Sequence, residues 1–221
     1  MIKSLFISKN PAEVTELQSF ADTNSFRITA KSFLQFKPVP FDVPKEYQVI
    51  FFSSPRAVTF FHSRYSVPSG VHIASVGGKT TALLKSMGYE VAFTGEDKGS
   101  ISEVATSFQN WLGDRKVLFP VSTKSLGTIS KGLPPDQTIH VTCYETQIQE
   151  HILESTFDVY VFTSPSNVEG FFAQNKLDGV STVIAWGDST AMALKKHQVF
   201  NFDVLREPSQ STLSSLLMKK V

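Results

Sequence analysis

The sequence contains a single cysteine, Cys143, among 221 residues, which excludes an internal disulfide and a cysteine-rich metal site. Neither sign of charge is in excess, because the formal net charge is only +1. No overall field therefore favours nucleic acid or an anionic membrane as a partner. No run approaches the roughly 20 apolar residues that span a bilayer, and the apolar run within residues 1–7 is too short for a signal peptide. We expect a soluble, cytoplasmic protein.

Phosphate-binding and metal-binding motifs are lacking as well. Lys79 and Thr80 follow two glycines, but residue 73, where a phosphate-binding loop of the Walker type needs glycine, is Ile73. Neither glycine-containing turn holds the spacing of a dinucleotide fingerprint. The five histidines show no metal-ligand spacing. These patterns therefore predict no Walker-type phosphate loop, no dinucleotide fingerprint and no histidine metal site.

One short pattern is present twice. Residues 49–58 read VIFFSSPRAV, and residues 159–168 read VYVFTSPSNV. Each is an apolar, β-prone run followed by a Ser-Pro pair and a helical pattern. This arrangement predicts a buried strand that turns directly into a helix, with Ser54 or Ser164 as N-cap and proline in the first helical position. The N-terminus of such a helix is a potential binding site for anions.

A second pattern repeats at the same offset. The glycine of IASVGGKT, Gly77, and the glycine of VIAWGDST, Gly187, are 110 residues apart, as are Ser54 and Ser164. Two motifs in the same order at one spacing are much stronger than either motif alone. They indicate an internal duplication that produces two α/β halves.

The remaining elements alternate between strands and helices. We expect strands at residues 4–7, 27–34, 116–119 and 138–144, and a short helix near residues 124–131. Prolines between Gln35 and Pro44 indicate a connection that leaves the first half. Alternation of this kind predicts parallel sheets covered by helices on both faces. In such open sheets, ligands bind beyond the carboxyl ends of the strands, where both repeated turns lie.

In these motifs, and in the segment VTCYET at residues 141–146, the sequence resembles the uroporphyrinogen-III synthase family. The resemblance implies an α/β fold of two flavodoxin-like lobes, each a three-layer α/β/α arrangement with a parallel sheet, with a cleft between them. Residues 1–35 and 148–221 would form one lobe and residues 42–141 the other. Residues 36–41 and 142–147 would form a two-stranded linker.

The resemblance also implies a reaction. The family closes hydroxymethylbilane, a linear tetrapyrrole with an acetate and a propionate on each ring, with inversion of the last ring and loss of water. It uses no metal or organic cofactor. We therefore expect a cofactor-independent lyase of tetrapyrrole and haem biosynthesis, acting as a monomer on a small molecule, with no nucleic acid or membrane partner.

The family's recurrent candidate acid corresponds to Tyr144, whose phenol would assist departure of the hydroxyl group. Substrate contacts are expected from residues at the repeated turns and from two nearby cations: Ser54, Arg56, Gly77, Thr80, Lys124, Ser164, Ser166, Gly187 and Thr190. The sequence departs from the family where many members carry Arg-Gly after the strand that ends near Phe119. Lys124 would substitute there as a point charge without a bidentate fork.

Other interpretations remain open. The duplicated turns are equally consistent with a two-lobed, non-catalytic protein that binds a small anion. A third interpretation, a nucleotide-binding enzyme, is less favoured because the phosphate-binding motifs are incomplete. Ser-Pro is also a common helix start, and a tyrosine at a strand end usually packs with its hydroxyl group in water. Cys143 precedes Tyr144 in the strand, so the two side chains are expected on opposite faces and Cys143 is assigned a structural role.

Overall fold

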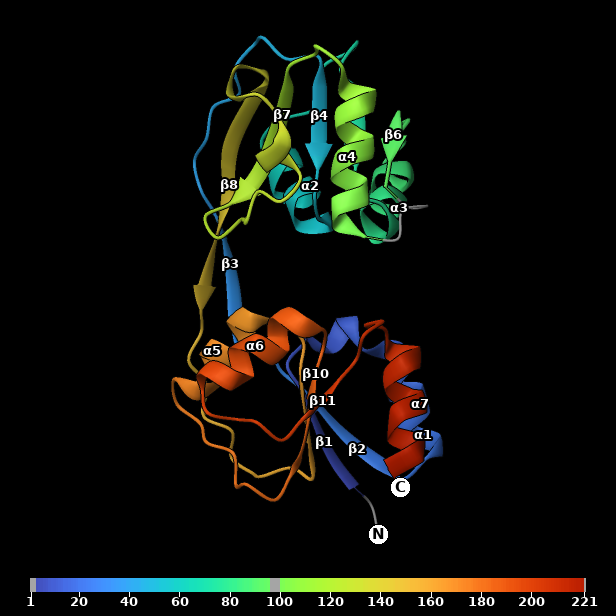
Figure 1. The fold of residues 1–221 in the computed structure, drawn as a ribbon, viewed down its shortest axis with the longest axis vertical. Helices are drawn as coiled ribbons and strands as arrows, with labels where there is room; N and C mark the ends of the chain where they lie inside the picture. The colour runs from blue at the N-terminus through green and yellow to red at the C-terminus, as the bar shows by residue number, and fades with distance from the viewer. Residues whose placement is uncertain (1–2, 96–99, 221) are drawn as a thin grey trace. The chain divides into compact units, whose positions relative to one another are not determined.

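The computed structural model describes residues 3–95 and 100–220, which form two compact units. The first unit comes from the described parts of Met1–Gln35 and Gln147–Val221, and the second is Phe36–Thr146. Each unit contains a sheet of mainly parallel strands with helices on both faces (Figure 1), so the predicted α/β class is confirmed.

Within the described residues, the first unit holds a five-stranded sheet in the order β11-β10-β9-β1-β2. By chain order within the unit this is 2-1-3-4-5, the order of flavodoxin-like folds. Its elements are β1 (Lys3–Ile7), the 3-10 turn η1 (Pro11–Glu13), α1 (Thr15–Thr23), β2 (Phe26–Ala30), β9 (Val159–Phe162), α5 (Pro165–Phe172), β10 (Thr182–Ala185), α6 (Asp188–Lys196), β11 (Asp203–Val204) and α7 (Gln210–Lys220).

The second unit holds a six-stranded sheet in the order β3-β8-β7-β4-β5-β6, among the residues that the structure describes. Apart from the edge strand β3, the strands follow the same order in space as in the first unit. The strands that correspond to β1 and β2 are β7 and β8, which come last in the chain of this unit. Its elements are β3 (Leu34–Pro38), β4 (Val49–Phe52), α2 (Pro55–His62), β5 (His72–Ser75), α3 (Gly78–Ser86), β6 (Phe93–Thr94), α4 (Ile101–Leu112), β7 (Val117–Ser122), the 3-10 turns η2 (Ser130–Gly132) and η3 (Pro135–Gln137), and β8 (Thr138–Ile148).

The duplication is visible element by element. The bounds of β4, α2, β5, α3 and β6 recur in β9, α5, β10, α6 and β11 with every residue number raised by 110. No insertion or deletion separates the copies from residue 49 to residue 94. The predicted internal repeat therefore describes backbone structure as well as sequence.

Alternation along the buried strands divides each core into two layers. In β4, Ile50 and Phe52 pack toward α2 and α3, while Val49 and Phe51 pack toward α4. The first unit is built in the same way, with α5 and α6 on one face of its sheet and α1 and α7 side by side on the other (Figure 1). Strands buried on both faces explain the continuous apolar runs in the sequence.

Three local expectations differ from the structure. The strand expected at residues 27–34 ends at Ala30, and β3 begins at Leu34 within the proline-containing connection. Pro38 is accommodated because β3 lies at the edge of its sheet, where a missing N–H group costs no ladder bond. The helix expected near residues 124–131 is absent, and only the short turn η2 begins there, at Ser130. Gly127, with φ of 60°, interrupts that segment.

Candidate active site

Both Ser-Pro turns have the predicted geometry. Ser54 and Ser164 are extended at φ of −161° and −164°, and each begins a helix with proline in the first turn. The Oγ atom of Ser54 accepts a hydrogen bond from the N–H of Ala57 at 3.1 Å, and that of Ser164 accepts from the N–H of Asn167 at 3.3 Å. The predicted N-caps are therefore confirmed, and both helices direct the positive ends of their dipoles to the carboxyl edge of the sheet.

The glycine turns are also matched. Gly77 and Gly187 precede α3 and α6 with φ of 110° and 93°, a conformation that favours glycine. Thr80 and Thr190 are 2% and 1% exposed, and the hydroxyl of Thr190 donates to the carbonyl of Trp186 at 3.2 Å. Both threonines are therefore buried beneath the turns, and Thr190 is bonded within its own turn.

Tyr144 lies on β8, next to the start of α2. Its side chain is 7% exposed, and its hydroxyl oxygen lies 3.5 Å from the Oγ of Ser54. The phenol ring stacks on Phe60, with centroids 4.7 Å apart and planes at 14°, and meets the edge of Phe36 at 6.2 Å. The structure therefore brings two predicted residues, Tyr144 and Ser54, into contact at the carboxyl edge of the second sheet.

The predicted cations differ in their surroundings. Arg56 is half-buried on α2, and its guanidinium carbon lies 4.1 Å from the centre of the Phe36 ring, within cation–π range. Lys124 is exposed in the loop after β7, where its backbone N–H donates to the Oγ of Ser122 at 3.2 Å. Arg56 thus belongs to the same cluster as Tyr144, because both contact Phe36, whereas Lys124 lies in the loop between β7 and β8. Ser166, which takes the position of Arg56 in the first unit, is half-buried.

Regular alternation predicted that Cys143 and Tyr144 lie on opposite faces of β8, and this prediction is wrong. Both side chains are buried in one core cluster, together with Phe52. The reason is a β-bulge, because Val121 of β7 faces Thr142 whereas the next residue, Ser122, faces Tyr144. The extra residue breaks the two-residue period. Burial raises the pKa of the Cys143 thiol to about 12, so it stays protonated and suits the predicted structural role.

Three residues near these turns were not predicted from the sequence. Phe36 and Phe60 frame Tyr144, as described above. Asn167 is buried on α5, and its Oδ1 accepts from the N–H of Phe33 at 2.9 Å. A comparison of the two repeats contained a signal for Asn167, because a buried amide there replaces Ala57 of the first copy.

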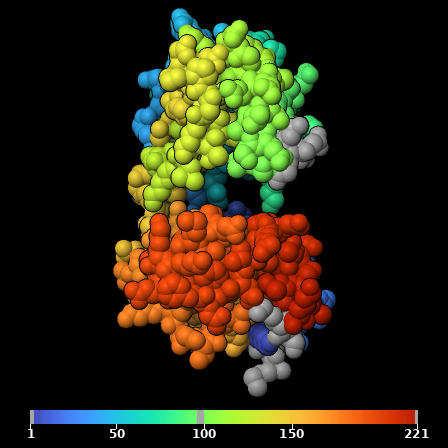
Figure 2. Space-filling model, viewed as in Figure 1, coloured from blue at the N-terminus to red at the C-terminus, as the bar shows by residue number. Residues whose placement is uncertain are grey.

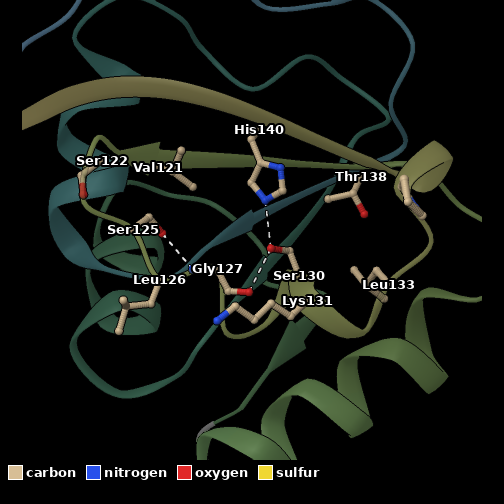
Figure 3. A pocket seen from close by; sticks show the side chains of 11 residues that line it. Val121, Ser122, Ser125, Leu126, Gly127, Ser130, Lys131, Leu133, Thr138 and His140 are labelled. Carbon is tan, nitrogen blue, oxygen red and sulfur yellow. Dashed lines mark hydrogen bonds between the residues drawn. The ribbon is translucent and has the colours of Figure 1, made fainter. Parts of the chain in front are cut away.

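A separate pocket of about 510 Å³ lies under the β7–β8 connection (Figure 3). On one side, Ser130 and His140 point toward each other, with Oγ and Nε2 2.9 Å apart, while Leu126 and Leu133 contribute apolar surface. The connection contains short 3-10 turns instead of a full helix and lies beside α4 on the surface of the second unit (Figure 2). None of the ten predicted site residues lines this pocket.

Within the described parts of the chain, no group of three or more histidine, cysteine or acidic side chains is arranged to hold a metal ion. No helix in residues 3–95 or 100–220 is long and apolar enough to cross a membrane.

Comparison with known proteins was made for sequence and for structure. The family model for uroporphyrinogen-III synthase HemD matches residues 23–217. No curated protein matches the sequence. The fold is similar to a uroporphyrinogen-III synthetase from Helicobacter pylori, with a TM-score of 0.74, 15% identity and 100% of both chains covered. It is also similar to a mutant uroporphyrinogen III synthase from Thermus thermophilus, with a TM-score of 0.61, 14% identity and 99% and 100% of the two chains covered. Because the family model spans most of its length, the chain belongs to the uroporphyrinogen-III synthase family.

Proposed function

We propose that this protein is a uroporphyrinogen-III synthase that closes hydroxymethylbilane with inversion of the terminal ring, and that Tyr144 assists the first step. Membership of the family supports the reaction. One observation carries the assignment of the residue: the Tyr144 hydroxyl lies 3.5 Å from Ser54, at the N-terminus of α2 and the carboxyl edge of the second sheet. This is the edge at which open α/β sheets bind ligands.

The first step breaks the C–O bond of the hydroxymethyl group. The phenol of Tyr144 donates a proton to the departing oxygen, which leaves as water, and the bilane keeps a positive charge. The positive end of the α2 dipole stabilises the phenolate that remains. The substituted carbon of the last ring then attacks the cation, and the ring inverts by fragmentation and reclosure. The proton that the macrocycle loses on closure restores the phenol, so the net change is loss of one water.

The carboxylates of the bilane need donors rather than bulk positive charge. We propose that the first turns of α2, α3, α5 and α6 supply them through backbone N–H groups and dipoles. Ser54, Ser164 and Ser166 would add hydroxyl groups, and Arg56 and Lys124 would add charge. Gly77 and Gly187 would allow close approach of the backbone, with Thr80 and Thr190 holding those turns from inside. This arrangement accounts for an anionic substrate on a chain whose net charge is +1.

Catalysis would then depend largely on conformation. The uncatalysed bilane closes at the free end of its last ring, without inversion. Holding the chain curled, so that the substituted carbon meets the cation first, selects the other product. No cofactor takes part in this scheme. All of its residues come from one chain, so a monomer would suffice, and sedimentation at the concentration of the assay tests that point.

The experiment that tests the function supplies fresh hydroxymethylbilane and separates the oxidised porphyrin isomers. Uroporphyrinogen III synthase activity yields isomer III, whereas spontaneous closure yields isomer I. Isomer I alone from folded protein would contradict the proposal. The second candidate, a non-catalytic anion-binding protein, would then be tested by titration with the bilane and with simple dicarboxylates.

Tyr144→Phe tests the residue. It keeps the ring that packs on Phe60 but removes the proton donor, so we expect kcat to fall about tenfold or more, within the typical range for general acids. The matched control is Tyr89→Phe, which removes a hydroxyl that lies 3.0 Å from the Nε2 of His62 in the same unit. Circular dichroism checks that both variants fold. Full activity of the Tyr144 variant would remove this residue from the mechanism.

A further inference from the structure

The two repeats differ at the place where the chemistry is proposed. Position 60 of α2 is phenylalanine, and its counterpart 110 residues later in α5 is Gly170. In the second unit, the side chain that meets this helix position is Tyr144. In the first unit it is Phe33, because a Cβ atom added at Gly170 would lie 2.5 Å from the Cβ of Phe33. The contact of Tyr144 with Phe60 in the second unit thus corresponds to the contact of Phe33 with Gly170 in the first.

The two aromatic residues stand near the carboxyl ends of corresponding strand pairs. Tyr144 ends the run of β8 beside β7, and Phe33 follows β2, which lies beside β1 in the same way. Phe33 is fully buried and carries no polar atom in its side chain. The duplicated frame therefore retains an aromatic side chain in both units, but a proton donor in only one.

Phe60 makes the closer of the two aromatic contacts that hold the ring of Tyr144 in place. The two planes are nearly parallel, at 14° and 4.7 Å, so Phe60 covers one face of the phenol. Phe36 closes the second side with its edge, at 6.2 Å and 64°. Between these two rings the phenol has little freedom, and its hydroxyl is directed to Ser54. Phe60 itself has no group that can donate a proton.

We infer that Phe60 is a positioning residue for the reaction, acting only through the hydroxyl of Tyr144; this rests on the function proposed above. A proton donor that is displaced by about 1 Å can lose up to about a hundredfold in rate. Replacing Phe60 with leucine removes the flat surface and lets the phenol ring tilt. The proton transfer occurs only on the way to the transition state, so kcat falls while KM stays nearly constant.

The test is a double-mutant cycle on the full-length protein, with kcat and KM for isomer III as readouts. Phe60→Leu should lower kcat about five- to tenfold, and Phe60→Tyr, which keeps the stacking ring, should restore most of it. In the Tyr144→Phe background, Phe60→Leu should change kcat less than twofold, because no donor remains to be positioned. The matched control is Phe172→Leu in α5, which removes a ring stacked on His197 at 4.5 Å. It should leave kcat unchanged.

The outcomes separate the two proposals. Isomer I alone from the wild-type protein would reject the function. Isomer III from the wild-type protein, with Phe60→Leu multiplying the loss in both backgrounds, would reject the positioning role and leave the function intact. A Phe60→Leu variant that is as active as the Phe172→Leu control would also reject the positioning role. If Phe60→Leu does not fold, Phe60→Met, which keeps the volume without a flat ring, takes its place in the same cycle with the same expected loss.

Discussion

Gly170 shows how closely helix α5 approaches the strand end beneath it. A Cβ atom at this position would lie 2.5 Å from the Cβ of Phe33 and 3.2 Å from its carbonyl oxygen. Alanine normally stabilises a helix interior by about 1 kcal/mol relative to glycine. Here the clash involves atoms next to the backbone, which cannot rotate away, and such overpacking costs about 1–3 kcal/mol. The clash therefore outweighs the gain in helix propensity.

We predict that Gly170→Ala lowers the free energy of unfolding by about 1 kcal/mol, as measured by urea denaturation. The control is Gly132→Ala, where the nearest atom to the new methyl group is the Oε1 of Gln109 at 3.8 Å. That substitution should change the free energy by less than about 0.5 kcal/mol. Equal effects at the two positions would contradict the proposed close packing.

Asp158 gives a pH-dependent contribution to stability. Its Oδ2 accepts hydrogen bonds of 2.7 Å from both the N–H and the hydroxyl of Ser4, which lowers the pKa of the carboxyl group below its usual value. A lowered pKa means that this stabilisation is fully present above the unfolded-state pKa, about 3.9, and is lost as pH falls through the folded-state pKa.

We predict that Asp158→Asn destabilises the protein at pH 7 and that the difference from the wild-type protein shrinks below about pH 4. Urea denaturation between pH 2.5 and pH 7 measures this. Ser4→Ala, which removes one of the two donors, should lose part of the same pH dependence. A difference that stays constant across the range would show that the carboxylate charge plays no part.

Helix ends differ between the repeats in one residue type. Helix α3 is followed, just beyond its C-cap, by Gly88 at φ of 85°, and α6 is followed at the same place by Gln198 at φ of 62°. Both ends make the same pair of backbone bonds. The N–H groups of Tyr89 and Val199 donate to the carbonyls of Leu84 and Leu194 at 3.1 Å. Those of Gly88 and Gln198 donate to the carbonyls of Lys85 and Lys195 at 3.0 Å. This is the Schellman arrangement, in which glycine is the usual residue. Gln198 therefore holds a left-handed conformation that costs roughly 1–2 kcal/mol.

We predict that Gln198→Gly stabilises the protein by about 0.5 kcal/mol, because relief of that conformation exceeds the extra entropy that glycine loses on folding. Gly88→Ala should have the opposite effect, of about 1 kcal/mol. Thermal unfolding of both variants gives the comparison. A lower Tm for Gln198→Gly would mean that the glutamine side chain makes a contact worth more than the strain.

Much of the element pattern could be predicted from local chemistry. Apolar runs ended by Ser-Pro or glycine gave the strands and caps of α2, α3, α5 and α6, because those signals act within a few residues. The contact of Tyr144 with Phe60 could not be predicted, because it joins residues 84 positions apart through a sheet order that local signals do not encode. The bulge at Cys143 was missed for a related reason, since it depends on the partner strand β7.

At the scale of the whole molecule, the chain passes between the units twice, and each core cluster takes all its described residues from one unit. The two tryptophans are divided between the units, with Trp111 on α4 and Trp186 after β10. Each can therefore report on one unit. Separate cores favour separate cooperative transitions.

We predict that Gly170→Ala lowers the urea midpoint reported by Trp186 and leaves that reported by Trp111 nearly unchanged. The measurement uses Trp111→Phe and Trp186→Phe backgrounds, so that a single fluorophore remains in each. If both signals shift by the same amount, the two units unfold as one cooperative body, and the prediction is wrong.

The order of strands along the chain has an evolutionary consequence. Each half of the sequence contains two leading strands, β1 and β2 or β7 and β8, followed by a β-α-β-α-β stretch and a final helix. Either half alone thus encodes a complete five-stranded flavodoxin-like set. In the folded protein, however, each leading pair completes the sheet of the other half. This arrangement is the intramolecular equivalent of the exchange of elements in a domain-swapped dimer. An ancestor with a single half would have needed no partner to close its sheet.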